Sequence, residues 1–150
     1  MNETLTLKPA AAETLARWHQ MIDARDLRLL PELLNPQAVF RSPMAFKPYE
    51  SAAAVSLILN TVVTVFEDFV YHRELASADG LNVVLEFSAR VGDRQLMGVD
   101  IIQFDSDGLI VDFEVMVRPA SGLQALGDEM GRRLAPQLAA LSAGSSAPSR

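Results

Sequence analysis

Hydrophobic positions along this chain change from a helical to a strand spacing about halfway along its length. In the first half, Leu15, Trp18 and Ile22 recur at i, i+3 and i+7, which predicts an amphipathic helix over residues 10–24. The same kind of spacing predicts a shorter second helix over residues 27–34, which the Asn-Pro dipeptide that follows should end. Each helix presents one apolar face, so both should pack against another layer.

A strand and a third helix are predicted next. Residues 38–42 alternate in a way typical of a short strand that ends at Pro43. An apolar stripe then begins at Ser51 and continues to Phe66, which predicts a third helix. The β-branched residues of this stripe have lower helix propensity, so its helical form depends on packing.

The second half of the chain predicts an antiparallel sheet and a last helix. From Glu67 the period is two, and turn signals at Asp79-Gly80, Gly92-Asp93 and Asp107-Gly108 divide four strands. A leucine-rich stripe from Leu123 to Leu141 predicts a C-terminal helix that docks on the body. The expected class is α+β, with three N-terminal helices packed on a curved antiparallel sheet and an extra C-terminal helix. We expect one domain over residues 1–141 and a disordered tail over residues 142–150.

Composition narrows the possible functions. With 150 residues, 49% of them hydrophobic, the chain can bury a sizeable core. A net charge of −6 and scattered cations argue against a nucleic-acid partner. No cysteine and just two histidines leave no thiolate or histidine-rich metal site, and no motif implies a cofactor. No apolar run approaches about 18 residues, so we expect no membrane span and a soluble, cytoplasmic protein.

Asp100 is the main candidate for chemistry. It stands alone in the strand Gly98–Phe104, which is otherwise built for burial. An unpaired buried carboxylate costs several kcal/mol, roughly, so such a group raises its pKa, finds a donor or faces a cavity. We therefore expect a pocket and an elevated pKa at Asp100. The alternative is a structural acid bonded to Trp18 or Ser42, with no ligand.

The turn at Gly92-Asp93 sets the register that decides which residues share the face of Asp100. A two-residue turn pairs Val91 with Arg94 and places Asp100 opposite Leu85. The competing register would place Glu86 beside Asp100 as a carboxylate pair. In the last strand, the alternation places four apolar residues on the buried face, which requires a bulge near Asp107-Gly108: Val111, Phe113, Val115 and Val117. Its other side chains should point outward, where a dimer contact is a candidate.

Three segments carry a family resemblance that covers about residues 10–118. They are Ile22-Asp-Ala-Arg-Asp-Leu27, Ala38-Val-Phe-Arg-Ser-Pro43 and Val99-Asp-Ile-Ile-Gln-Phe-Asp-Ser-Asp-Gly-Leu-Ile110. These segments and the element order resemble the cone-shaped NTF2-like fold, and within it the SnoaL-like and ketosteroid-isomerase-like proteins. The family includes isomerases, cyclases, dehydratases, hydrolases and non-catalytic binders, so the resemblance implies a cavity rather than a reaction.

When the site residues of the ketosteroid-isomerase-like proteins are matched to positions in this sequence, the resemblance implies that one of them is present and that others are replaced. Asp100 falls where ketosteroid isomerase, the standard example of a carboxyl held neutral by an apolar site, keeps its protonated acid. The oxyanion-hole tyrosine falls on Trp18, the general base on Ser42, and a further tyrosine on Leu59. Because a serine without an adjacent base cannot take a proton from carbon at a useful rate, Asp100 must itself be the base or no proton is moved. The acidic pattern of limonene-epoxide-hydrolase-like members is replaced by Leu85-Glu-Phe and Glu114-Val-Met.

The predicted site therefore joins two chemical residues to an apolar lining. Asp100 and Trp18 are the candidate catalytic residues. The predicted ligand-binding residues are Ser42, Met44, Phe46, Tyr49, Leu59, Leu85, Phe87, Leu96, Ile102, Phe113, Val115 and Val117. His72 is expected at the surface or an interface, and His19 at a helix edge.

Three functional hypotheses follow. The first is an isomerase- or cyclase-type enzyme acting on a small, apolar, carbonyl-bearing molecule. The second is a non-catalytic homodimer that binds a small apolar ligand. The third is an interaction adaptor that uses the stripe from Leu123 to Leu141 as an exposed apolar patch. The supply of a proton acceptor in the pocket separates the first hypothesis from the others.

Overall fold

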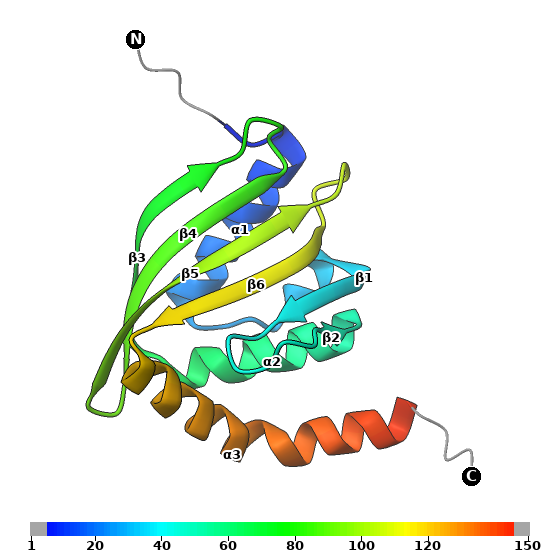
Figure 1. Ribbon diagram of the computed structural model, residues 1–150. Helices are drawn as coiled ribbons and strands as arrows, with labels where there is room; N and C mark the ends of the chain where they lie inside the picture. The colour runs from blue at the N-terminus through cyan, green and yellow to red at the C-terminus, as the bar shows by residue number, and fades with distance from the viewer. Residues whose placement is uncertain (1–5, 146–150) are drawn as a thin grey trace.

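The computed structural model describes residues 6–145, with side chains described as far as residue 137, and it has a mixed α+β architecture. Three α-helices, one short 3-10 helix (η1) and six strands follow one another (Figure 1). Their bounds are α1 Pro9–Ala24, η1 Leu30–Leu33, β1 Leu34–Arg41, β2 Tyr49–Glu50, α2 Ala52–Val65, β3 Glu67–Ala76, β4 Asn82–Val91, β5 Arg94–Phe104, β6 Ile110–Arg118 and α3 Ala120–Ser145.

The six strands form one curved sheet in the order β2-β1-β6-β5-β4-β3. The predicted antiparallel meander is confirmed, since β3, β4, β5 and β6 pair antiparallel in chain order. The expectation of a wholly antiparallel sheet was wrong, because β1 pairs parallel with β6. A parallel pair needs a long crossover, and here β2, α2 and the three strands β3 to β5 lie between the two partners in the chain.

Several predicted elements differ from those observed. The second helix, expected over residues 27–34, is only the 3-10 turn Leu30–Leu33, because Pro31 would lie in the interior of the longer helix, where it lacks a backbone N–H, and Leu34 already begins β1. The short strand β2 lies in a segment for which no strand is predicted. Helix α3 continues to Ser145 and so includes residues 142–145, which the sequence assigns to the tail. The rest of that predicted tail, residues 146–150, lies outside the described residues.

The register around Asp100 agrees with the preferred prediction. Val91 pairs with Arg94, and Asp100 pairs with Leu85, so the alternative pairing with Glu86 is wrong. The bulge predicted near Asp107-Gly108 lies slightly later, at Val111, which has no partner between the pairs Gln103–Asp112 and Phe104–Ile110. As a result Ile110, rather than Val111, is buried beside Phe113.

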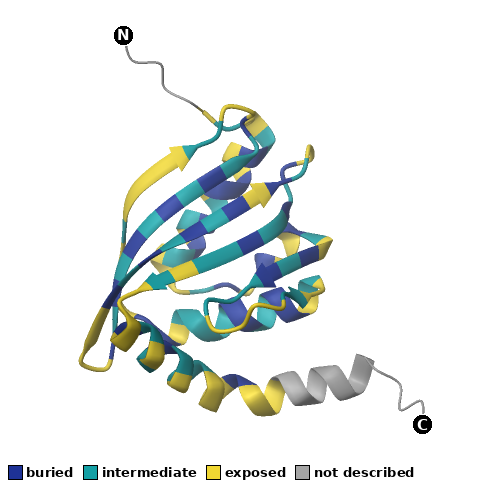
Figure 2. Cartoon of the chain, in the orientation of Figure 1, coloured by how far each residue is buried: buried dark blue, intermediate teal, exposed yellow. Residues whose placement is uncertain are grey.

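The helices lie on the inner side of the curved sheet. Buried and less buried residues alternate along the strands (Figure 2). One core cluster joins the buried face of α1, including Leu15 and Trp18, to the sheet. A second cluster, which contains Phe87 and Leu126, lies where α3 approaches the sheet. Helix α3 also contacts α2, so it forms a wall across the end of the layered structure (Figure 1).

None of the helices in residues 6–145 is both long enough and apolar enough to cross a membrane.

Candidate functional site

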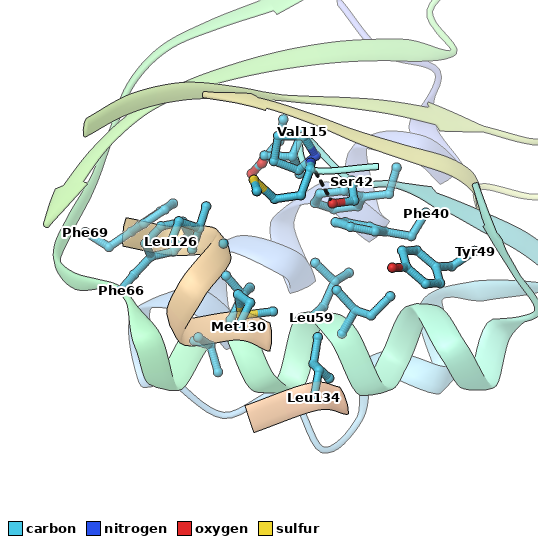
Figure 3. Close-up of a pocket in the computed structure, with 18 of the residues that line it drawn as sticks. Phe40, Ser42, Tyr49, Leu59, Phe66, Phe69, Val115, Leu126, Met130 and Leu134 are labelled. Atoms are coloured by element: carbon cyan, nitrogen blue, oxygen red, sulfur yellow. Dashed lines mark hydrogen bonds between the residues drawn. The ribbon is translucent and has the colours of Figure 1, made fainter. Parts of the chain in front are cut away.

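A cavity of about 300 Å³ lies between the sheet and the helices α1, α2 and α3 (Figure 3). Its volume is at the lower end of the range typical of small-molecule sites, roughly 300–1,000 Å³. Most of its surface is apolar. Eight of the predicted site residues lie in its lining: Trp18, Ser42, Met44, Tyr49, Leu59, Asp100, Phe113 and Val115.

The other six predicted site residues do not line the cavity. Leu85 and Ile102 are buried in the first core cluster, while Phe87 and Leu96 are buried in the second. Val117 packs against that second cluster, and Phe46 lies fully exposed on the loop after β1. The strand alternation identified the inner face of the sheet correctly, but the cavity occupies a limited part of that face because helices cover the rest.

Three parts of the lining were not predicted from the sequence. The first is Tyr71 on β3, and the second is the wall formed by α3, which contributes Leu126, Met130 and Leu134 (Figure 3). The third is a set of side chains from α1, α2 and the segments beside them: Ile22, Arg25, Phe40, Pro43, Ile58, Val62, Val63, Phe66 and Phe69. The leucine-rich stripe of α3 indicates docking, but nothing in its spacing indicates that it docks over a cavity. A buried carboxyl that lacks a donor on its own strand was the available signal for Tyr71.

Three polar side chains form a hydrogen-bonded chain on the sheet side of the cavity. The indole Nε1–H of Trp18 donates to Tyr71 Oη over 3.0 Å. The hydroxyl of Tyr71 in turn donates to Asp100 Oδ2 over 2.5 Å. Asp100 is therefore partnered neither by Trp18 nor by Ser42 directly, as the structural alternative supposes, but by a tyrosine that Trp18 holds in place.

Burial and hydrogen bonding act in opposite directions on Asp100. Removal of the carboxylate from water raises its pKa and the hydrogen bond from Tyr71 lowers it, with a net rise from 3.8 to about 7. The direction of this shift agrees with the elevation expected from the sequence. Burial and the neighbouring charge of Asp100 raise the pKa of Tyr71 well above its usual value of 10, so this phenol stays protonated and acts as a donor.

One oxygen of Asp100 remains free for a ligand. Among the described residues, Oδ1 of Asp100 has no hydrogen-bond partner. Every fully buried polar side-chain atom in this part of the chain does have a partner, so Oδ1 is not fully buried. Since Asp100 also lies in the cavity lining, Oδ1 opens onto the cavity. A carboxyl with this pKa and a free oxygen can either accept or donate a proton near neutral pH.

Two hydroxyl groups lie on the side of the cavity formed by β1, β2 and the loop between them. Ser42 Oγ accepts a hydrogen bond from the backbone N–H of Met44 over 3.0 Å, and the rest of the lining near Ser42 is apolar (Figure 3). Within the described part of the chain, neither Ser42 nor Tyr49 donates its hydroxyl hydrogen to another group. Both hydroxyls are thus available as donors to a ligand oxygen.

The two histidines lie outside the cavity lining, as expected. His72 is exposed, and its Nε2 lies 2.7 Å from Ser88 Oγ. His19 lies at the edge of α1, with Nε2 3.0 Å from Glu74 and its ring edge-on to Tyr71. No cluster of metal-ligating side chains occurs in the part of the chain that the structure describes.

Comparison with known proteins agrees with this architecture. The family model described as a SnoaL-like domain matches residues 15–113. The chain therefore belongs to the SnoaL-like family. A comparison with curated protein sequences found no match.

Solved structures extend the comparison to the whole fold. The chain is 71% identical to a protein of known crystal structure described as a steroid delta-isomerase from Pseudomonas aeruginosa, with a TM-score of 0.87 and coverage of 91% of this chain and 99% of that one. An uncharacterized protein with a cystatin-like fold from Silicibacter pomeroyi is 33% identical, with a TM-score of 0.79 and coverage of 86% and 90%. An NTF2-like protein of unknown function from Mesorhizobium loti, 19% identical, has a TM-score of 0.66 over 77% of this chain and 100% of that one, a likeness of fold.

Proposed function

We propose that this protein is an isomerase that moves a proton within a small, apolar, carbonyl-bearing molecule, with Asp100 as its acid–base group. The free oxygen of Asp100 carries this proposal, because it places a carboxyl with a pKa of about 7 against a mainly apolar cavity. A general base works best when its pKa lies near the working pH, since it must both take up the proton and release it.

The proposed reaction is the shift of a double bond into conjugation with a ketone. Ionised Asp100 takes the proton from the carbon between the carbonyl and the double bond. The electrons of that C–H bond form a dienolate, whose charge rests on the carbonyl oxygen. Protonated Asp100 then returns the same proton to the far carbon of the former double bond. One carboxyl performs both steps, so neither a redox partner nor a second base is required.

The dienolate oxygen needs hydrogen-bond donors, and Asp100 cannot be one of them while it acts as the base. Tyr71 is also committed, because its single hydroxyl hydrogen already points to Asp100. Arg25, the one cation of the described lining, donates to the carbonyl oxygens of Val63 and Phe66, whereas the hydroxyls of Ser42 and Tyr49 donate to no other group there. We assign them to the ligand oxygen, a role in which loss of a single donor typically costs about 100-fold or more in rate.

The similarity to the Pseudomonas aeruginosa protein supports the choice of a first substrate. That protein, 71% identical to this chain, is described as a steroid delta-isomerase, and a fused-ring ketone also suits a cavity whose lining is mainly aromatic and aliphatic. We therefore propose β,γ-unsaturated steroid ketones as the substrate class. The conjugated product absorbs ultraviolet light more strongly than the unconjugated substrate, which makes turnover directly measurable.

The test follows conversion of androst-5-ene-3,17-dione by wild type, by Asp100→Asn and by Glu86→Gln. Glu86 is a matched control, because it is a carboxylate on the neighbouring strand that pairs with exposed Arg73 and does not line the cavity. We expect Asp100→Asn to lower kcat/KM by about 100-fold or more, and Glu86→Gln to leave it unchanged. Wild-type activity should rise as pH increases through about 7, because the base must be ionised. Full activity of Asp100→Asn would refute the assignment of the base.

A second candidate is a homodimer that binds an apolar ligand without converting it. Asp100 is the one carboxyl of the described lining, and the position of the family's base holds Ser42. If steroid ketones bind to wild type and no conversion is detected, with binding altered by Asp100→Asn, this second function replaces the first. Sedimentation of the free and ligand-bound protein then tests the dimer.

A further inference from the structure

Helix α3 presents two parallel rows of side chains to the cavity, one large and one small. The large row is Leu126, Met130 and Leu134, and the small row is Gly127, Gly131 and Ala135. Within each row the spacing is four residues, which places the members of a row above one another on the helix. Leu126 and Leu134 are only 4% and 7% exposed, so the large row anchors the helix. The small row is left to shape the opening of the cavity.

The two glycines of the small row face different surroundings. A β-carbon at Gly127 would lie 2.5 Å from Cε of Met44, the flexible end of a half-exposed side chain, so Met44 would have to move to admit an alanine there. A β-carbon at Gly131 would meet no heavy atom of the described residues within 4 Å. Gly131 weakens the helix relative to alanine, yet no neighbouring group needs the space. The position lines the cavity and is also exposed, so it forms part of the cavity mouth.

We propose that Gly131 determines the size of the ligand, by leaving an opening through which a molecule longer than the enclosed cavity extends past α3. This inference rests on the proposed function, in which the carbonyl end of the ligand lies near Asp100. Asp100 belongs to the sheet and Gly131 to the helix on the other side of the cavity. A ligand that reaches both is elongated, as steroid ketones are, and its distal end lies at the mouth.

Replacement of Gly131 by leucine should weaken the binding of long ligands and leave that of short ligands unchanged. The new β-carbon would meet no heavy atom of the described residues within 4 Å, and we expect the rest of the leucine side chain to occupy the opening. A single-ring ketone that stays near Asp100 would not reach it. A four-ring ketone would lose the space for its distal rings. The same substitution would affect both ketones equally if Gly131 served only the packing of the helix.

The experiment measures binding of cyclohex-2-enone and of androst-4-ene-3,17-dione by calorimetry, for wild type and four variants. These are Gly131→Ala, Gly131→Leu, Arg132→Leu and Asp100→Asn. Trp18, the one tryptophan of the sequence, lines the cavity, and its fluorescence provides a second readout. Arg132→Leu is the matched control, because it adds leucine to an adjacent exposed position outside the cavity lining.

We expect Gly131→Leu to weaken binding of the four-ring ketone by about tenfold or more and to leave the one-ring ketone within about threefold, with Gly131→Ala in between. Arg132→Leu should match wild type for both. The role of Gly131 would be overturned if Gly131→Leu bound the four-ring ketone as tightly as wild type does, or if it lost the same affinity for both ketones. Altered binding by Asp100→Asn in the same experiment would show that the proposed function still holds. If wild type binds neither ketone, the proposed function and this inference are both wrong.

Discussion

At the residue scale, the proton affinity of Asp100 is a balance between burial and one hydrogen bond. Burial raises its pKa, and the hydroxyl of Tyr71 stabilises the ionised form and lowers it. The resulting value of about 7 leaves the carboxyl able to exchange a proton near neutral pH. Tyr71 is in turn held by the indole of Trp18. Trp18 thus acts on Asp100 through Tyr71, as a positioning residue that also lines the cavity.

Tyr71→Phe tests this balance. Without the hydroxyl, the ionised form of Asp100 loses its donor, so the pKa of Asp100 should rise above about 7. The indole of Trp18 also loses its acceptor, which should reduce the free energy of unfolding by about 1–3 kcal/mol. A titration of the Asp100 carboxyl carbon by NMR measures the first effect, and denaturant unfolding measures the second. Tyr49→Phe is the matched control, because it removes a cavity hydroxyl that does not contact Asp100, and the carboxyl should titrate as in wild type. A pKa that stays the same or falls in Tyr71→Phe would contradict the assigned role of the tyrosine.

The sequence predicted Asp100 and Trp18 but not the residue that joins them. Asp100 was recognisable because a single carboxylate in an apolar strand is costly, and its opposition to Leu85 followed from the turn at Gly92-Asp93. Tyr71 could not be placed in the same way, because the pairing of β3 with β4 shifts register on both sides of residues 70 and 71. Such irregularities break the alternation that assigns side chains to a face. The alternation of residues along β3 therefore could not predict that Tyr71 donates to Asp100.

At the scale of the elements, the turns between strands fix how the sheet meets α1. Gly92 joins β4 to β5 with φ of 61°, and Gly108 lies in the turn between β5 and β6 with φ of 86°. A β-carbon at Gly92 would meet nothing within 4 Å among the described residues, whereas one at Gly108 would lie 2.5 Å from the carbonyl oxygen of Ala10. The first glycine serves its turn alone, while the second also allows the turn to lie against the start of α1.

Substitution of these two glycines distinguishes the energetic cost of backbone strain from the cost of close packing. Gly92→Ala should cost about 1–2 kcal/mol of unfolding free energy, the penalty of a left-handed conformation for a residue with a β-carbon. Gly108→Ala carries the same penalty and must also displace the start of α1, so it should cost about 1–3 kcal/mol more. Urea unfolding of both variants beside wild type gives the comparison. Equal losses would mean that α1 moves away freely and that the contact with Ala10 has little energetic importance.

Local signals predicted the turns and the meander, but not the elements that depend on distant contacts. Glycine beside aspartate has a local physical cause, and the strand register followed from it. By contrast, β2 is two residues long and forms only because β1 lies alongside it. The parallel pairing of β1 with β6 joins segments some seventy residues apart, as in the pair Phe40 and Phe113. The cavity wall formed by α3 is a contact of the same distant kind, which explains why its residues were absent from the predicted lining.

At the scale of the whole molecule, the buried acid links stability to pH. Asp100 has a folded-state pKa of about 7 against an ordinary value of 3.8. Below about pH 4 it is protonated in both the folded and the unfolded state and imposes no charge penalty. As pH rises from about 4 to 7, the unfolded state loses the proton first, so folding becomes progressively less favourable. Above pH 7 the folded state is ionised as well, and the penalty stays constant. Since one pKa unit corresponds to about 1.4 kcal/mol, the total change is on the order of 4 kcal/mol.

Comparison of wild type with Asp100→Asn isolates this contribution from that of the other carboxylates. Surface ion pairs such as Arg41 with Asp112 and Arg73 with Glu86 are common to both proteins, so their pH dependence cancels in the difference. We expect Asp100→Asn to gain stability relative to wild type as pH is raised from 4 to 8, on the order of 4 kcal/mol, with the steepest change below pH 7. Urea unfolding at a series of pH values measures the difference. If the two stability curves run parallel across this range, Asp100 is ionised in the fold with an ordinary pKa, and the base proposed for the isomerase loses the property that suits it to proton transfer.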